Sequence, residues 1–167
     1  MNFDVAFEKL IGHEGGYTRA PNDRGNWTTG VIGKGDLRGT KYGISAMAYP
    51  HEDIAGMTLD RACEIYRADY WDAVQAEYLP DAVRFDIFDA AVNSGVRQAV
   101  KWLQLAAKAE PDGTVGPKTL LAARMADPQL LAKRFNGARL RFMTSLPTWQ
   151  HFGKGWARRI ADNLLEA

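Results

Sequence analysis

Residues 3–17, FDVAFEKLIGHEGGY, place a glutamate at the end of an amphipathic stretch and follow it directly with two glycines. A helix is expected to run from Asn2 to Glu14 and to stop at the glycines. At 100° per residue, four of its side chains would fall within about 60° of one another: Phe3, Phe7, Leu10 and Glu14. Burial at the edge of this apolar face would raise the pKa of the Glu14 carboxyl, as a general acid requires. A core-edge glutamate neutralised by an arginine is the alternative that helical phase leaves open.

The composition is that of an ordinary globular protein. The chain has 167 residues, with 46% hydrophobic and 25% charged side chains, so one domain, or one domain with a small appendage, is expected. The single Cys63 cannot form an internal disulfide, and its helical context favours a buried thiol over a nucleophile. Three scattered histidines and one cysteine make a metal site improbable, so no metal and no cofactor are expected.

Two stretches begin like the zinc-binding His-Glu-x-x-His motif but lack its second histidine. Tyr17 stands where the second histidine of a His-Glu-x-x-His motif would follow His13, and Ala55 stands there after His51.

The N-terminus shows neither a basic region nor an apolar run, so no signal peptide is visible. No stretch approaches the roughly 18 apolar residues of a membrane span.

Charge is distributed unevenly along the chain. Residues 128–161 contain no acidic side chain and seven basic ones: Lys133, Arg134, Arg139, Arg141, Lys154, Arg158 and Arg159. Such a segment would be attracted to an anionic polymer or surface. A recognised nucleic-acid motif is missing, so no nucleic-acid partner is expected. A solvated face with some interhelical ion pairs is the alternative.

The remaining pattern predicts a mainly α-helical protein with one glycine-rich loop region. Residues 17–50 are rich in glycine and are expected to form turns with short strands near Thr40–Ile44, and so long an irregular stretch is usually functional. Thr58 is expected to cap the next helix, which would end before Pro80. Further helices are predicted over Asp81–Ser94, Val96–Ala109, Pro117–Met125, Gln129–Leu146 and Trp156–Leu165.

Two carboxylates and several threonines are the candidate catalytic residues. Glu14 is followed nine positions later by Asp23, and then by Thr28, Thr29 and Thr40. Hydrolysis of a glycosidic bond commonly needs a protonated carboxyl to load the leaving oxygen and a second group across the sugar. A helix end carrying Glu14 and a loop carrying Asp23 could supply both. An ordinary turn aspartate that caps local amides is the alternative for Asp23.

Seven short motifs are spread along the chain: residues 13–17 (HEGGY), 22–25 (NDRG), 40–44 (TKYGI), 70–72 (YWD), 85–95 (FDIFDAAVNSG), 112–119 (DGTVGPKT) and 152–159 (FGKGWARR). Through these motifs the chain resembles glycoside hydrolase family 108, the lysozyme-like muramidases found among bacteriophage endolysins and related bacterial proteins. The resemblance covers nearly the whole chain, and its second half is similar to the predicted peptidoglycan-binding region of this family.

This resemblance implies a lysozyme-like fold, with a catalytic region over residues 1–95 and a helical peptidoglycan-binding region over residues 96–167 that shares its core. It also implies that Glu14 is the catalytic acid, that Asp23 completes the site with a threonine, and that no cofactor is used. Thr29 has the spacing of more distant phage lysozymes, whereas Thr40 precedes the Tyr-Gly-Ile of the family; Thr40 is favoured.

Further residues are candidates for sugar binding. Tyr42 and Asn93 come first, because an asparagine amide can both donate to and accept from an acetamido group, although helix C-capping is the alternative for Asn93. Tyr17 and Trp27 could stack on sugar rings, with packing as their alternative, and Thr29 could contact the substrate. Of Asp86 and Asp89, one is expected to pair with an arginine, and neither is assigned to catalysis.

The resemblance implies hydrolysis of the β-1,4 bond between N-acetylmuramic acid and N-acetylglucosamine. The expected protein is a monomeric endolysin, made in the host cytoplasm and released to the periplasmic peptidoglycan by a separate holin-type pore. Its basic C-terminal region would contact wall polymer or an anionic outer membrane. A non-catalytic wall-binding or secretion-related protein and a chitinase-like glycosidase are the rival functions. The sequence leaves open whether the anomeric centre is inverted or retained.

Overall fold

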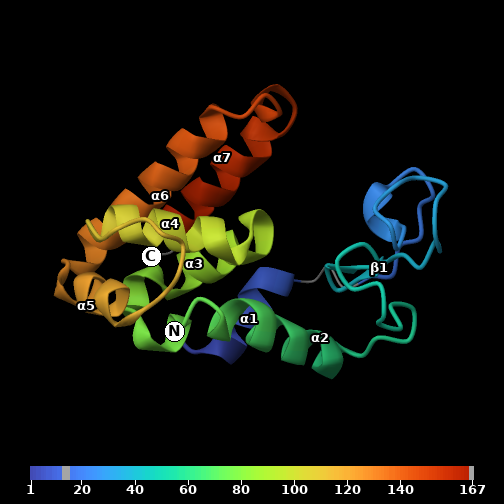
Figure 1. Ribbon diagram of the computed structural model, residues 1–167, viewed down its shortest axis with the longest axis horizontal. Coiled ribbons are helices and arrows are strands. Elements are labelled where there is room, and N and C mark those ends of the chain that lie inside the picture. Colours follow the sequence, from blue (N-terminus) through green and yellow to red (C-terminus); the bar gives the residue numbers. More distant parts are fainter. Residues whose placement is uncertain (13–15, 166–167) are drawn as a thin grey trace. The chain divides into compact units, whose positions relative to one another are not determined.

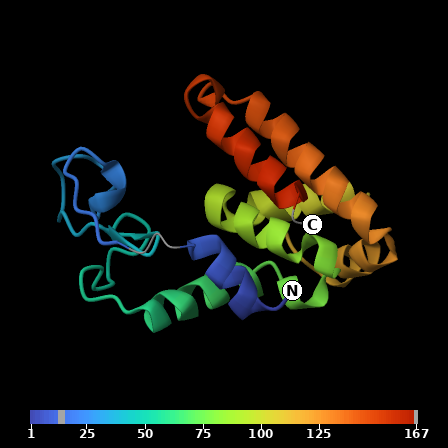
Figure 2. The same cartoon turned by 180° about the vertical axis from the view of Figure 1, so that it is seen from behind.

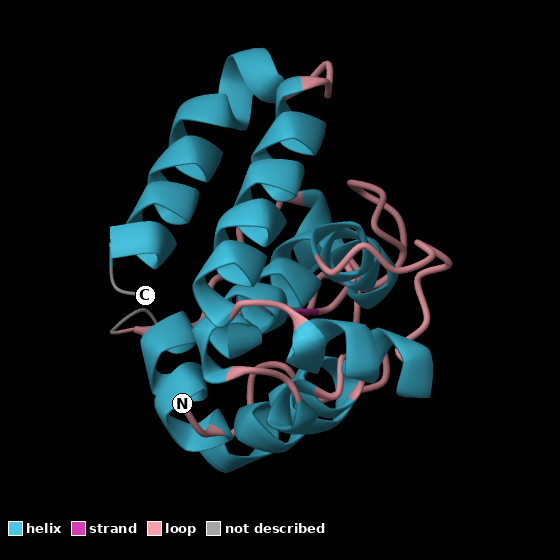
Figure 3. Ribbon diagram, turned by 90° about the vertical axis from the view of Figure 1, so that its left-hand side faces the viewer, coloured by secondary structure: helices cyan, strands magenta, loops and turns pink. Residues whose placement is uncertain are grey.

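The computed structural model describes residues 1–12 and 16–165 and divides the chain into two compact units (Figure 1). Unit 1 comprises Met1–Phe3 with Ala68–Ala167, and unit 2 comprises Asp4–Arg67. The described parts hold seven α-helices and one two-stranded hairpin, which confirms the predicted mainly α-helical class (Figure 3). None of the described helices is both long and apolar enough to cross a membrane.

Unit 2 is built on two helices. Helix α1 (Phe3–Ile11) buries Ala6 and Phe7, and the Phe7 ring lies 5.6 Å from the Tyr66 ring of α2 (Leu59–Tyr66). Thr58 caps α2 as predicted, because its hydroxyl accepts a hydrogen bond of 3.1 Å from the backbone N–H of Arg61.

The glycine-rich segment of unit 2 is held by a few short elements. They are the 3-10 turn η1 (Arg24–Asn26) and the antiparallel strands β1 (Thr40–Lys41) and β2 (Ile44–Ser45). Gly39 precedes β1 with φ +87°, and a Cβ at this position would lie 2.4 Å from the carbonyl oxygen of Thr18. Both the backbone angle and the close approach therefore require glycine there.

Unit 1 is a helical assembly in which α3 packs against α4 and α6, and α6 packs against α4 and α7. Figures 1 and 2 show α6 and α7 running side by side as an antiparallel pair. The elements of this part of the chain are η2 (Arg67–Asp72, π-helical), η3 (Ala76–Tyr78), α3 (Asp81–Ser94), α4 (Val96–Ala106), α5 (Pro117–Met125), α6 (Pro128–Thr144) and α7 (Trp149–Leu165).

Three aromatic rings organise one end of this core. Phe3, Trp71 and Phe88 are each at most 2% exposed, and their ring centroids lie 5.5–5.9 Å apart in edge-to-face pairs. Such pairs add about 0.5–1.5 kcal/mol beyond the area that they bury. Trp71 is therefore a core residue.

Helices α3 and α5 have the predicted bounds, whereas several other helix ends differ from the prediction, including both ends of α6, which runs from Pro128 to Thr144. Helix α4 ends at Ala106, because Lys108 adopts the left-handed conformation with φ +57°. Helix α7 begins at Trp149 and not at Trp156. The start was not predicted because the first half of α7 contains glycines, which disfavour helix. Gly153 is nevertheless required, since a Cβ there would lie 2.5 Å from the Trp149 ring one turn earlier.

The turn before α5 is held by a buried glutamine. The Gln104 amide nitrogen donates to the Asp112 carboxylate at 2.8 Å and its oxygen accepts from the Gly113 N–H at 2.8 Å. The bond from Gln104, together with one from the Thr114 backbone N–H, also holds the pKa of Asp112 below its ordinary value. The Asp-Gly-Thr-Val-Gly-Pro stretch therefore has a structural role.

Candidate active site

The candidate acid Glu14 lies outside the described residues. Helix α1 ends at Ile11, and Gly12 follows in the left-handed conformation with φ +57°. The prediction of one continuous helix through residue 14 is therefore wrong, and the helical-phase argument for Glu14 does not apply. The role of Glu14 as the acid stays a prediction carried by the family resemblance.

Asp23 lies in an exposed turn at the start of η1. Its carboxylate oxygen accepts a 2.8 Å hydrogen bond from the Gly25 N–H, which makes it the N-cap of this turn. This contact is the local amide capping that the sequence left open. It fixes one oxygen of the carboxylate, while the exposed side chain keeps its other oxygen open to solvent or substrate.

Asn26 ties the Asp23 turn to the Thr40 strand. It is fully buried, its amide nitrogen donates to the Ala20 carbonyl at 3.0 Å, and its Oδ1 accepts from the Thr40 hydroxyl at 2.7 Å. Its backbone carbonyl accepts from the N–H groups of Arg38 and Gly39 at 2.9 and 3.0 Å. One asparagine thus satisfies groups from two separate stretches of the loop region, at Ala20 and at residues 38–40.

Thr40 is half-buried in β1, and its backbone pairs with Thr18 on one side and with β2 on the other. Its N–H and carbonyl pair with Thr18 at 2.9 Å each, and it lies opposite Ser45 across the hairpin. Because its hydroxyl donates to Asn26, the oxygen retains lone pairs that can accept a hydrogen bond from water. The structure therefore brings Thr40 together with the Asp23 turn.

Thr29 is used differently. Its hydroxyl donates to the Lys34 carbonyl at 2.7 Å and accepts from the Val31 N–H at 3.3 Å, so it closes the exposed loop between residues 29 and 34. Trp27 is half-buried, and its indole N–H donates to the Pro21 carbonyl at 2.9 Å. Both side chains hold the loop in place.

Tyr42 occupies the tight turn between β1 and β2. It has φ +50°, an uncommon value for a residue other than glycine, and its carbonyl accepts a 3.1 Å hydrogen bond from the Tyr66 hydroxyl. The Lys41 ammonium lies 5.4 Å from the centroid of its ring. The helix α2 therefore supports the turn that presents the Tyr42 ring.

A polar pocket of about 410 Å³ lies within unit 2. Tyr17 is half exposed at its wall, and its hydroxyl donates to the Arg38 carbonyl at 3.0 Å. The other lining residues include Arg19, His51, Glu52 and Asp53. Arg61 holds the pKa of Glu52 below its ordinary value by direct hydrogen bonding. Within the described residues, no cluster of histidine, cysteine and carboxylate side chains suits a metal ion.

Asn93 belongs to the other compact unit. Its amide nitrogen donates to the Asp89 carbonyl at 2.7 Å and to the Asp89 carboxylate at 3.1 Å, near the end of α3. The first contact resembles the capping role that the sequence left open. In the described structure Asn93 therefore belongs to a different polar cluster from the residues around Thr40.

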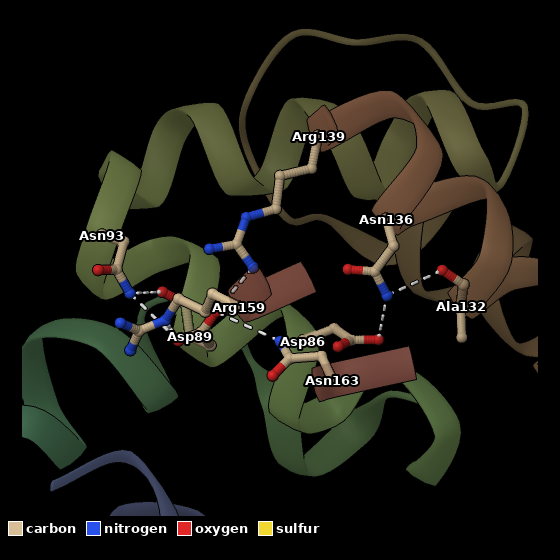
Figure 4. A network of polar contacts seen from close by, with 8 residues as sticks. All are labelled: Asp86, Asp89, Asn93, Ala132, Asn136, Arg139, Arg159 and Asn163. Atoms are coloured by element: carbon tan, nitrogen blue, oxygen red, sulfur yellow. Dashed lines mark hydrogen bonds and ion pairs between the residues drawn. The ribbon is translucent and has the colours of Figure 1, made fainter. Parts of the chain in front are cut away.

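That polar cluster is centred on Asp89, which is 1% exposed (Figure 4). Its carboxylate accepts from Arg139 at 2.7 Å, from Arg159 at 2.6 Å and from Asn163 at 3.3 Å. Pairing of an α3 aspartate with an arginine was expected and is confirmed. The contacts join α3, α6 and α7, because each helix supplies at least one partner.

Asp86, one turn earlier on α3, is buried beside this cluster. It accepts a 2.8 Å hydrogen bond from the Asn136 amide nitrogen, and Arg139 and Asp89 lie near it. Burial raises the pKa of Asp86 to about 6, although the bond from Asn136 opposes the shift.

Cys63 is half-buried, and its burial raises the pKa of its thiol, which disfavours a nucleophilic role.

Sequence reasoning missed Asn26, Arg139 and Asn163. The signal for Asn26 was its place directly after the Asp-Arg-Gly turn, which predicts a turn residue but not a buried one. The signal for Arg139 was a cation at a helix position surrounded by apolar residues. It pointed to a buried partner, and Asp89 is that partner.

The structure is mainly helical, and a loop carries Asp23 and Thr40 next to a short hairpin. Residues 7–95 match the family model described as glycosyl hydrolase 108, and residues 98–161 match the one described as a predicted peptidoglycan domain. The chain belongs to glycosyl hydrolase family 108. The two matches together imply that it hydrolyses peptidoglycan.

A solved structure supports this assignment. The chain is similar to the structure of Brucella abortus SagA, with 31% sequence identity and a TM-score of 0.81, over 98% of this chain and 92% of that chain. No curated protein matches it. The domain boundary predicted at residue 95 stays a prediction, and in the described structure this position lies between the packed helices α3 and α4.

Proposed function

We propose that the protein is a muramidase that cleaves the β-1,4 bond between N-acetylmuramic acid and N-acetylglucosamine. The observation that carries this proposal is the link from the Asp23 turn through Asn26 to Thr40, in a chain of glycosyl hydrolase family 108. The chain leaves α1 and passes through Glu14 before it reaches this link. Two carboxylates on either side of a sugar are the usual requirement of this chemistry.

In the proposed mechanism Glu14 protonates the leaving glycosidic oxygen. Asp23, held by the Gly25 N–H, stabilises the positive charge that develops at the anomeric carbon or orients the attacking water. Thr40 accepts a hydrogen bond from that water, since its own hydroxyl hydrogen is committed to Asn26. The Tyr42 ring, at the neighbouring turn, contacts the sugar.

The test compares the wild-type chain with Glu14→Gln on purified sacculi, with the released fragments identified by mass spectrometry. Muramidase action places new reducing ends on N-acetylmuramic acid, and Glu14→Gln is expected to lower the rate by at least about 10²-fold. Binding to sacculi is expected to persist. Reducing ends on N-acetylglucosamine, equal cleavage of chitin, or no release of fragments by the wild type would each contradict the proposal.

Thr40→Val and Thr29→Val form a matched pair for the choice of threonine. The first removes the hydroxyl that is linked to Asn26, and the second removes one that only closes its own loop. We expect the larger loss of turnover from Thr40→Val. A larger loss from Thr29→Val, with both variants folded, would reassign the site.

We further propose an endolysin role, in which the enzyme reaches the periplasmic peptidoglycan through a separate pore. The resemblance to a family that includes bacteriophage endolysins supports it. Expression in a bacterium with and without a co-expressed pore protein tests the route. Lysis is expected only with the pore, and prompt lysis without it would contradict the route.

The basic C-terminal region is proposed to hold the enzyme on wall polymer or an anionic membrane. Six of its basic side chains are exposed in the described structure: Lys133, Arg134, Arg141, Lys154, Arg158 and Arg159. Added salt is expected to weaken binding to sacculi, because exposed charges are screened within about 8 Å at physiological ionic strength. Binding that does not change with salt would remove this proposal.

A further inference from the structure

A hollow of about 590 Å³ lies in unit 1. The end of α3 and the start of α4 form one side, and the second half of α6 with the first half of α7 forms the other. The residues that give it chemical character are Asn93, Gln98, Arg139, Phe142, Trp156 and Arg159.

The charged side chains that line this hollow are two arginines. Arg139 and Arg159 both pair with Asp89, and Asp86 lies near Arg139 (Figure 4). The Nε of Arg139 is buried without a hydrogen-bond partner among the described residues, and the Arg159 side chain is 42% exposed. None of the described lining residues is acidic. The exposed guanidinium of Arg159 can therefore pair with a carboxylate from a ligand in addition to Asp89.

The other walls are amphipathic. Phe142 is 40% exposed, and Trp156 is half-buried against Phe152, with the two rings stacked 5.8 Å apart. The amides of Asn93 and Gln98 lie at the same wall and can serve as donors or acceptors. The hollow thus combines apolar surface with a few polar groups, as small-ligand sites do.

A second and more open hollow, of about 910 Å³, lies beside the first. Gln98 and Phe142 line both hollows, and the second adds two further cations, Lys101 and Arg141. A ligand that crosses Phe142 would meet a cationic group at each end. This arrangement suits an extended chain with more than one carboxylate.

We propose that these two hollows bind the peptide arm of peptidoglycan through its carboxylates. The proposal rests on the proposed function, because it takes peptidoglycan as the polymer that the enzyme meets. The glycan strand does not fit the charge, since its sugars are neutral where the lactyl carboxyl is joined to the peptide. The arm carries free carboxylates along a short chain, and one of them would lie against Arg159 while another would lie near Lys101 or Arg141.

The test measures binding of the free tetrapeptide L-Ala-γ-D-Glu-meso-diaminopimelyl-D-Ala to the full chain by titration calorimetry. Arg159→Gln is expected to weaken binding at least about tenfold, whereas Arg158→Gln, which removes the same charge from an exposed neighbour, should change it less than about twofold. Peptide with amidated carboxyl groups and glycan strands freed of peptide should bind at least about tenfold more weakly. The melting temperature of each variant checks its fold.

Lys101→Gln is a second variant that leaves the Asp89 cluster intact. It is expected to weaken the tetrapeptide about threefold. Absence of tetrapeptide binding by the wild type, or equal losses in Arg158→Gln and Arg159→Gln, would overturn the proposal. Release of fragments from sacculi by the same wild-type preparation shows separately whether the proposed hydrolase function stands.

Discussion

The raised pKa of Asp86 makes this residue the origin of a defined pH dependence of stability. Between pH 4 and pH 6 the folded chain holds a proton on Asp86, whose ordinary pKa is 3.8 and whose folded value is about 6, whereas the unfolded chain does not. The contribution of Asp86 to the free energy of unfolding therefore falls as the pH rises through this window, by about 3 kcal/mol in all. Above pH 6 this contribution is constant.

Asp86→Asn removes the titration and keeps the shape of the side chain. Chemical denaturation of both chains at a series of pH values is the measurement. We expect the variant to gain stability relative to the wild type between pH 4 and pH 6, with no further change above pH 6. Parallel stability curves for the two chains would contradict the assignment.

At the same scale, the sequence predicted some partners and missed others. The sequence predicted that either Asp86 or Asp89 pairs with an arginine, and Asp89 does so. The burial of Asn26 did not follow, because its partners Ala20 and Thr40 come from distant positions of a loop without a repeating pattern. Local spacing gives helix faces, but it does not give contacts across irregular backbone.

The element that depends most on one side chain is the loop region around Asn26. Asn26→Ala would leave the Thr40 hydroxyl and the Ala20 carbonyl without their partner in a buried setting. We expect a loss of about 2–3 kcal/mol in the free energy of unfolding, together with lower turnover, because Thr40 loses its orientation.

Asn22→Ala is the matched control, since Asn22 is exposed in the same turn region. It should stay within about 0.5 kcal/mol of the wild type. Urea denaturation and the rate of sacculus solubilisation provide the two measurements. If both variants lose stability equally, Asn26 is not the tie between the turn and the strand.

The bounds of the elements were predictable where capping residues mark them. Thr58 and Asp127 both accept hydrogen bonds from the first turn of their helices, as expected from their types. The end of α1 was not predicted, because Gly12 ends it before the Gly15-Gly16 pair that seemed the stronger signal in the sequence. A single left-handed glycine leaves no trace in hydrophobic periodicity.

For the whole molecule, uneven burial predicts uneven opening. The α3, α4 and α6 helices bury a continuous core, whereas residues 31–36 are all exposed. Amide hydrogen exchange should therefore be slowest in these helices and at least about 10³-fold faster in the loop. Uniform protection throughout the chain would contradict this expectation.

The helical class and the long loop region followed from composition and periodicity, because both are properties of short windows of sequence. The two compact units did not follow. Phe3 joins unit 1 by packing on Trp71 and Phe88, far away in the sequence, and such long-range contacts have no local signature.

The packing of α3 on α4 and α6 has a consequence for the construction of chimeras. A graft that exchanges the C-terminal region at Gly95, where the family matches change, would remove α4 and α6 and expose the side chains of α3 that pack against them. Transplanting α3 together with the helices that follow it would keep that surface covered. Evolutionary shuffling of this region would have met the same constraint.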